Sequence, residues 1–266
     1  MHDTAEQAVE RVIATMLDNL SEPLTIDDMA RVAMFSKFHF SRMFQRATGL
    51  SPGRFLSALR LQRAKQLLVS TSLNVADISM RVGYTSVGTF SSRFSRSVGL
   101  SPTTYRRLGG YTPQIRPDSG TEAAYGTVRG VIHAHPTTVR QVTFVGLFPD
   151  RIPEGRPVSC AILDRAGQYA LERVPKGAWY LLAHAVPAGT EDSPDGAGLN
   201  YDDLSVGIVG PIEMRRDSTI ESVDLQLKPM RTMDPPVLLA LFDVRKDALI
   251  RAGARTSNSY GPFAAA

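Results

Sequence analysis

The sequence is poor in the residues that form covalent cross-links and membrane spans. It contains one cysteine, Cys160, among 266 residues, so no disulfide can form within the chain. No stretch approaches the roughly 18 consecutive apolar residues of a transmembrane helix. The first 20 residues are amphipathic and acidic, unlike the apolar core of a signal peptide. We therefore expect a cytoplasmic protein that does not enter a membrane.

Patterns typical of catalytic and metal sites are also scarce. Cys160 stands in no nucleophile motif, and we interpret it as a structural residue. His133 and His135 point the same way in a predicted strand and, with His184, form a candidate metal set. No carboxylate or cysteine accompanies them at a fixed spacing, and the aspartates around Gly196 miss the spacing of an EF-hand loop. We expect no enzyme activity, no cofactor and no bound metal.

Charge is low overall, at +4, but it is unevenly distributed. Residues 23–107 contain 13 Lys and Arg against 3 Asp and Glu, a balance of +10, whereas residues 111–266 contain 16 against 18. Positive charge concentrated in one part of a chain is typical of a surface that binds nucleic-acid phosphates. On charge alone, a solvated basic face is the alternative.

The basic part contains the same sequence pattern twice. The segment LTIDDMARVAMFSKFHFSRMFQRATGLSPGRF, from Leu24, is matched by NVADISMRVGYTSVGTFSSRFSRSVGLSPTTY, from Asn74, without a gap. The identical pairs include Asp27/Asp77, Arg31/Arg81, Val32/Val82, Ser36/Ser86, Phe40/Phe90, Phe44/Phe94 and the two GLSP tetrapeptides. A match of this density indicates an internal duplication.

Each copy has the features of a helix-turn-helix motif. In the first copy Thr25 caps a short helix, Ser36 caps a second helix and Gly49 ends it; Ser86 and Gly99 repeat the last two signals. One face of each second helix carries phenylalanines for a core, and the opposite face is typical of a helix that reads a major groove. The outward residues are Lys37, Phe38, His39, Arg42, Gln45 and Arg46 in one copy, and Gly88, Thr89, Ser92, Arg93 and Arg96 in the other.

An amphipathic segment, residues 54–69, predicts a linker helix between the copies. Its roughly fifteen residues would span about 22 Å. Two reading helices on one face of a duplex enter successive major-groove turns about 34 Å apart. We therefore expect one chain to cover two successive groove segments.

These motifs resemble the DNA-binding domain of the AraC/XylS family of transcriptional regulators. The resemblance rests on SKFHFSRMFQRATGLSPGRF, LRLQRAKQLL and GYTSVGTFSSRFSRSVGLSPTTYR. It implies base contacts by Lys37, Phe38, Ser41 and Arg42 in the first copy and by Gly88, Thr89 and Ser92 in the second. Family members often carry a basic residue where Ser92 stands, and we expect the neighbouring Arg93 to compensate in part. We expect phosphate contacts from Ser36, Arg46, Arg54, Ser86 and Arg96.

From Gly126 onward the hydrophobic period changes from helix to strand. Seven short runs predict an antiparallel β-sandwich: GTVRGVIHAH, TVRQVTFVGLF, SCAILD, QYALERV, AWYLLAHAV, LSVGIVG and TIESVDLQLK. The phrase from Gly167 to Leu181 resembles a pattern of carboxypeptidase-regulatory-like and transthyretin-like sandwiches. That resemblance implies a fold and leaves the ligand open.

The predicted organisation is a two-domain chain, α then β. Residues 1–110 form an all-α domain with two helix-turn-helix motifs, and a first helix, over 6–19, packs on it. Residues 111–125 form a linker. Residues 126–250 form the β-sandwich with a C-terminal helix over 237–250, a strand over 237–244 being the alternative. Residues 251–266 form a flexible tail.

We therefore expect a sequence-specific DNA-binding transcriptional regulator whose partner is double-stranded DNA. The β-domain would sense a small-molecule effector, form a homodimer or contact another protein such as RNA polymerase. One alternative is a weakly specific architectural DNA-binding protein. Another is a β-sandwich, either a binding module or an enzyme, tethered to DNA.

Overall fold

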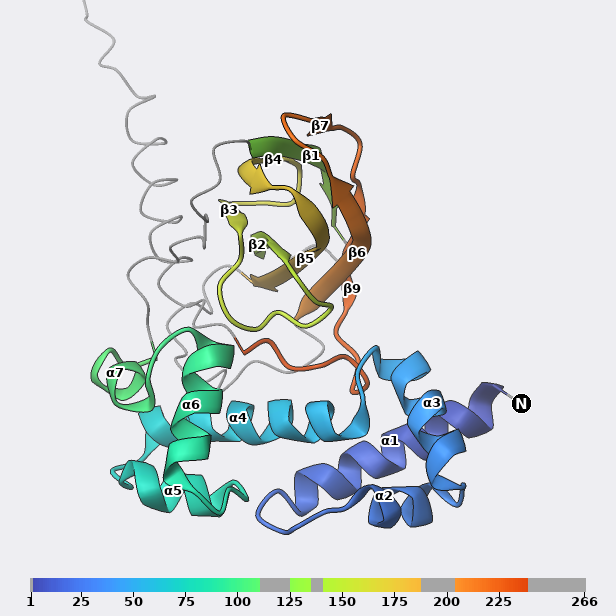
Figure 1. Ribbon diagram of the computed structural model, residues 1–266, viewed down its shortest axis with the longest axis vertical. Helices are drawn as coiled ribbons and strands as arrows, with labels where there is room; N and C mark the ends of the chain where they lie inside the picture. Colours follow the sequence, from blue (N-terminus) through green and yellow to red (C-terminus); the bar gives the residue numbers. More distant parts are fainter. Residues whose placement is uncertain (1, 111–124, 135–140, 188–203, 239–266) are drawn as a thin grey trace, which may run out of the picture.

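A computed structural model describes residues 2–110, 125–134, 141–187 and 204–238 (Figure 1). The first range is helical and the other three are rich in strands. A helical domain with the two helix-turn-helix motifs is therefore followed by a strand-rich region, in the order that the sequence predicts. None of the described helices is long and apolar enough to cross a membrane.

The helical domain contains seven helices in its described residues. They are α1 (His2–Asp18), α2 (Ile26–Ala33), α3 (Lys37–Thr48), α4 (Pro52–Ser70), α5 (Val75–Arg81), α6 (Val87–Val98) and α7 (Pro102–Arg107). The linker helix α4 extends beyond the predicted 54–69 at both ends and is about 28 Å long at 1.5 Å per residue. Figure 1 shows α4 running between the two helix-turn-helix motifs, α2 with α3 and α5 with α6.

Phenylalanines repeated in the two copies form the centre of the helical core. Phe40 and Phe44 contact each other with ring centroids 5.5 Å apart, and Phe90 and Phe94 do so at 5.6 Å. All four side chains are fully buried. The helical spacing of apolar residues in the first helix predicts that Leu17 also faces the core, but Leu17 is 45% exposed. It lies in the last turn of α1, next to the end of the helix.

Two sheets make up the strand-rich region. The strands are β1 (Tyr125–His133), β2 (Gln141–Phe148), β3 (Ser159–Leu163), β4 (Gln168–Pro175), β5 (Gly177–Pro187), β6 (Ser205–Met214), β7 (Thr219–Ile220), β8 (Leu225–Gln226) and β9 (Lys228–Pro229). One sheet has the order β4-β1-β7, with β8 also paired to β1, and the other has the order β3-β2-β5-β6-β9. Apolar side chains of both sheets, such as Val128 and Leu181, belong to one buried cluster.

Two details of the predicted sheet were wrong. β1 pairs in parallel with β7 and β8, so the arrangement is not purely antiparallel. The last predicted strand, over 219–228, is divided into three short strands. Ser222, between β7 and β8, has a φ of 61°. This left-handed conformation cannot continue a strand, which explains the break between β7 and β8.

The C-terminal helix is not seen in the residues that the structure describes. Val237 and Leu238 have no regular secondary structure, and residues 239–250 of the predicted helix lie outside the described ranges. The tail over 251–266 and nearly all of the linker over 111–125 also lie outside them; Tyr125 belongs to β1. Leu238 is fully buried against the helical core.

A loop of the strand-rich region also packs into the helical domain. This β2–β3 loop (residues 149–158) places Ile152, which is 2% exposed, in the hydrophobic cluster of the helices. The amide of Gly155 donates to the carbonyl of Ser97 on α6 at 2.8 Å. The two parts of the chain therefore share a packed interface, above α4 in Figure 1.

Candidate DNA-binding surface

Equivalent hydrogen bonds fix the starts of the two reading helices, α3 and α6. The Ser36 hydroxyl oxygen accepts from the amide of His39, and the Ser86 hydroxyl oxygen accepts from the amide of Thr89, both at 3.4 Å. Both serines are therefore N-caps, as predicted. Each hydroxyl keeps its hydrogen for donation, and the first amides of each helix are available to an anion. Both helices end at a glycine with positive φ, 78° for Gly49.

The N-terminal half of α3 presents the predicted base-contacting residues to solvent. Phe38 is 80% exposed, which is costly for a phenylalanine that meets no partner. Lys37 forms an exposed ion pair with Asp27 of α2, with Nζ and Oδ1 2.8 Å apart. Arg42 is exposed, and the hydroxyl of half-buried Ser41 donates to the Lys37 carbonyl at 2.9 Å. All four residues lie on the same helix, near its exposed N-terminal end.

The corresponding part of α6 is exposed but carries smaller side chains. Gly88, Thr89 and Ser92 are all exposed. Arg93 differs from them, because its side chain is 29% exposed and its Nη2 lies 3.8 Å from Oε2 of Glu154 in the β2–β3 loop. The long cation expected to compensate for Ser92 therefore faces the strand-rich region.

The predicted phosphate-contacting arginines fall into two groups. Arg46 and Arg96 are exposed and form no ion pair with the described residues. Arg54, at the start of α4, is held by two carboxylates of the β2–β3 loop. Its Nη1 donates to Asp150 at 2.6 Å, and its Nη2 donates to Glu154 at 3.1 Å.

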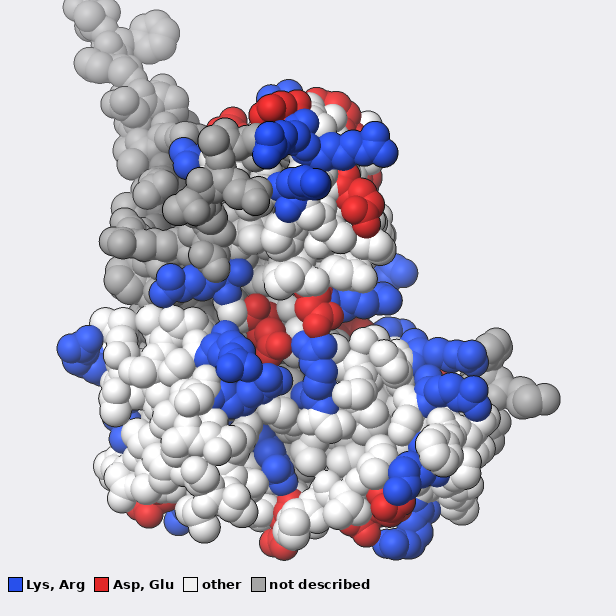
Figure 2. Space-filling view, in the orientation of Figure 1, with Lys and Arg blue, Asp and Glu red and all other residues white. Residues whose placement is uncertain are grey.

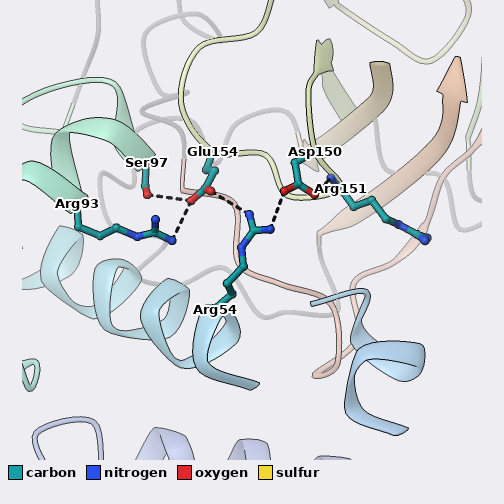
Figure 3. A network of polar contacts seen from close by, with 6 residues as sticks. All are labelled: Arg54, Arg93, Ser97, Asp150, Arg151 and Glu154. Carbon is teal, nitrogen blue, oxygen red and sulfur yellow. Dashed lines mark hydrogen bonds and ion pairs between the residues drawn. The ribbon is translucent and has the colours of Figure 1, made fainter. Parts of the chain in front are cut away.

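The β2–β3 loop thus joins both halves of the duplicated domain (Figure 3). Glu154 accepts hydrogen bonds from Arg54 of α4 and, at 2.9 Å, from the Ser97 hydroxyl of α6. Its side chain is 18% exposed, so this carboxylate is largely removed from water. Figure 2 shows acidic groups at the junction of the two parts, flanked by Lys and Arg.

The ionisation of Asp150 and Arg54 reflects this pairing. Burial alone would raise the pKa of the Asp150 carboxyl, but hydrogen bonds from Arg54 and from the Arg151 amide outweigh it and lower that pKa. Burial alone would lower the pKa of Arg54, but Asp150 and Glu154 outweigh it and raise that pKa. Both groups are therefore held in their charged forms.

Sequence reasoning missed Asp150 and Glu154 as partners of the helical domain. The available signal was an apolar residue, Ile152, flanked by acidic residues and prolines in a loop. Such a loop indicates a docking segment, but it does not tell which arginines the carboxylates contact.

The candidate metal and thiol residues that the structure describes form no metal cluster. His133 is exposed, with Nε2 3.8 Å from Asp224, whereas His184 is buried on β5. No cluster of three or more His, Cys, Asp or Glu suited to a metal occurs among the described residues, and His135 lies outside them. Burial raises the pKa of the Cys160 thiol to about 11. The aspartates around Gly196 also lie outside the described residues.

Comparison with known proteins places the similarity in the helical domain. A family model described as a helix-turn-helix domain matches residues 29–108. The HTH-type transcriptional activator AarP of Providencia stuartii is 30% identical over 98 residues, which are 37% of this chain and 73% of that protein. The melibiose operon regulatory protein of Escherichia coli is 29% identical over 113 residues, which are 42% of this chain and 37% of that protein. The chain thus spans well under two thirds of the melibiose regulator.

Solved structures give matches of similar extent. An AraC-type transcriptional regulator from Chromobacterium violaceum is 30% identical, with 39% of this chain and 93% of that chain covered and a TM-score of 0.38. The DNA-binding domain of AdpA in complex with a target DNA is also 30% identical. Here 38% of this chain and 90% of that chain are covered, and the TM-score is 0.37.

Proposed function

The chain belongs to the AraC/XylS family of helix-turn-helix transcriptional regulators, and we propose that it regulates transcription by reading two successive major-groove segments of one duplex. The observation that carries this proposal is the pair of equivalent reading helices. Each is capped by a serine, and each presents an exposed N-terminal half that the strand-rich region leaves uncovered. The α4 helix between them gives the fixed separation that two groove segments require.

The base-reading roles fall on the N-terminal halves of α3 and α6. Phe38 would meet a thymine methyl or a sugar, and Arg42 would donate to a guanine. Lys37 would exchange its solvent-exposed ion pair with Asp27 for a contact with DNA, since such pairs contribute little. The remaining base contacts are assigned to Ser41, Gly88, Thr89, Ser92 and Arg93.

The phosphate contacts are assigned to the helix starts and to basic side chains around them. The backbone amides and hydroxyls at Ser36 and Ser86 would bind phosphate oxygens. Arg46 and Arg96 would add two cations that have no ion pair with the described residues. Arg54 would contribute only after it leaves Asp150 and Glu154.

The strand-rich region is assigned a regulatory role. We take residues 1–110 as the DNA-binding domain, 111–125 as the linker, 126–250 as a β-sandwich with a C-terminal helix, and 251–266 as the tail. The likeness to carboxypeptidase-regulatory-like and transthyretin-like sandwiches supports the fold only. Glu154 contacts both α4 and α6, which supports a role of the strand-rich region in altering DNA binding. The signal would come from an effector, a second copy of the chain, or a protein such as RNA polymerase.

One observation favours the architectural alternative. Gly88 and Ser92 offer few hydrogen bonds to base edges, and Arg93 is drawn toward Glu154. A second helix of this kind would add phosphate affinity with little sequence preference. A ratio of specific to non-specific affinity near one would support this alternative.

Selection of genomic fragments by the full-length chain, at near-physiological salt, tests the proposal. We expect enrichment of a motif with two boxes about one helical turn apart. Repeating the selection with Arg42→Ala should relax the preference in one box and keep the other. Recovery of no motif would contradict sequence-specific reading and leave the architectural alternative.

A further inference from the structure

A cavity of about 570 Å³ lies between the helical domain and the strand-rich region. The C-terminal end of α3, from Arg46 to Gly49, forms one wall, and Arg151 and Pro153 of the β2–β3 loop form another. Strands β2, β5, β6, β8 and β9 and the segment after β9 complete the lining. This volume falls within the range of small-molecule sites, and junctions between domains are where such sites often occur.

The side of the cavity formed by the sheet is apolar. Phe144 and Leu182 are 3% and 7% exposed and contribute to this side, next to Ile208. Ile208 is 41% exposed, so a large apolar side chain of β6 meets solvent there. An apolar group bound in the cavity would remove this surface from water.

The charged side chains of the cavity leave an excess of positive charge. The lining includes four cations and two anions: Arg46, Arg151, Lys228 and Arg231 against Asp224 and Asp234. Asp234 is paired with Arg231 at 3.1 Å, and Asp224 accepts from the Val131 amide at 2.9 Å. The other three cations form no ion pair with the described residues. Both carboxylates therefore already accept a hydrogen bond or form an ion pair, whereas three of the four cations are available to a bound anion.

We propose that this cavity binds a small organic anion, with a carboxylate, sulfonate or phosphate group on an apolar body. The anionic group would lie between Arg46, Arg151 and Lys228, where charge-assisted hydrogen bonds are strongest. The apolar body would pack on Phe144 and Ile208. A DNA backbone fits less well, because its phosphates gain nothing from that apolar wall.

The position of the cavity links it to DNA binding, a consequence that rests on the proposed function. Arg46 belongs to α3, and a Cβ placed on Gly49 would lie 3.8 Å from the Arg151 Nε, so Arg151 lies beside the end of this reading helix. Arg151 also follows Asp150, which holds Arg54. A bound anion would occupy Arg46 and add negative charge beside α3. The bound anion therefore weakens the binding of DNA to α3, because its negative charge repels the phosphates.

Titration of the full-length chain with anilinonaphthalene sulfonate, an aromatic anion whose fluorescence rises on binding, tests the site itself. The uncharged phenylnaphthylamine has the same rings without the sulfonate and isolates the contribution of charge. We expect one saturable sulfonate site per chain, with tighter binding of the sulfonate than of the uncharged probe. Several weak sites, or equal affinity for both probes, would overturn the proposal.

Two exposed cations of the cavity give the decisive variant. Arg151→Glu with Lys228→Glu should weaken sulfonate binding at least about tenfold, the loss expected for charged hydrogen bonds. It should change binding of the uncharged probe less than about twofold. The matched control is Arg165→Glu with Lys176→Glu, which makes the same charge change at exposed positions outside the cavity lining. An equal loss in this control would overturn the site, because net charge alone would then explain the binding.

A third measurement separates this inference from the proposed function. Affinity for the selected duplex, measured with and without the sulfonate, should fall severalfold when the probe is present, and the Arg151/Lys228 variant should lose this response. Probe binding without an effect on DNA would overturn the regulatory consequence while the anion site stands. Absence of specific DNA binding would overturn the proposed function. The probe titration would still show whether the cavity binds an organic anion.

Discussion

Arg54 and Glu154 are 100 positions apart in the chain, yet their side chains form an ion pair with Nη2 and Oε1 3.1 Å apart. Arg54 begins the helix that joins the two reading helices, and Glu154 lies in a loop of the strand-rich region. The same carboxylate accepts from Ser97 of the second reading helix. A carboxylate outside the family domain therefore contacts both the linker helix and the second reading helix.

Replacing this carboxylate should increase DNA affinity. In Glu154→Gln the charge that holds Arg93 is lost, so this cation becomes available to phosphates, whereas Arg54 keeps its ion pair with Asp150. Allowing for solvent screening, we expect a gain of about 0.5–1 kcal/mol, or about two- to fivefold in Kd, and a steeper dependence on salt. Titration of a labelled duplex at several salt concentrations measures both. Glu172→Gln, an exposed change on β4, is the control, and an equal effect there would contradict competition between Glu154 and DNA.

Two exposed arginines should differ in how they affect sequence preference. Arg42→Ala should cost about 1–3 kcal/mol on the selected site and much less on random DNA, because a base contact is lost. Arg96→Ala should weaken binding to both sequences about equally and reduce the salt slope by about one. Arg63→Ala, on the exposed face of α4, is the control. If Arg42→Ala lowers both affinities equally, its assignment to a base is wrong.

Neighbouring phenylalanines on α3 should separate stability from recognition. Phe40 is fully buried, and Phe40→Ala should lower the free energy of unfolding by about 3–5 kcal/mol. Phe38 is 80% exposed, so Phe38→Ala should leave unfolding almost unchanged while it weakens DNA binding. Denaturant titration and duplex titration of the two variants give the comparison. Normal DNA binding by folded Phe38→Ala would remove this residue from the site.

The pairing of Asp150 should make the interface sensitive to acid. Its pKa in the folded protein is lowered from the ordinary value of 3.8, so its contribution to stability is present above that value. The contribution is lost as the pH falls through the lower, folded pKa. Melting temperatures of wild type and Asp150→Asn should therefore differ by a constant amount above about pH 5 and converge in stronger acid. A difference that grows on acidification would show the opposite sign and reject this linkage.

The single thiol should be unreactive in the folded chain. Burial raises the pKa of Cys160 to about 11 from an ordinary 9.0, so the thiolate fraction at pH 8 falls by about a hundredfold. Labelling with iodoacetamide should be slower than for an unfolded sample by at least that factor. Rapid labelling of the native protein would mean that the thiol is exposed or activated.

Much of the helical domain could be predicted because its signals are local. Each reading helix begins after a serine whose side chain accepts a hydrogen bond from an amide three residues later. It ends at a glycine with positive φ, so both ends of the helix are set by residues close to it in the chain. The strand-rich region was less predictable at its end. Residues 219–228 alternate like one strand, but positive φ at Ser222 interrupts them, and the pairing with β1 is parallel. Pairing partners lie far apart in the chain, so the alternation alone does not select them.

The sequence by itself determined the duplication, the caps of the reading helices and the outward face that carries Phe38 and Arg42. Each of these depends on residues within a few turns of one another. Only the tertiary structure decided that Arg54 and Arg93 face Glu154, and that Arg46 lines a cavity with Arg151. An arginine in a sequence carries the same charge whether it meets a phosphate, a carboxylate or water. Which of these it meets depends on how the strand-rich region docks on the helices.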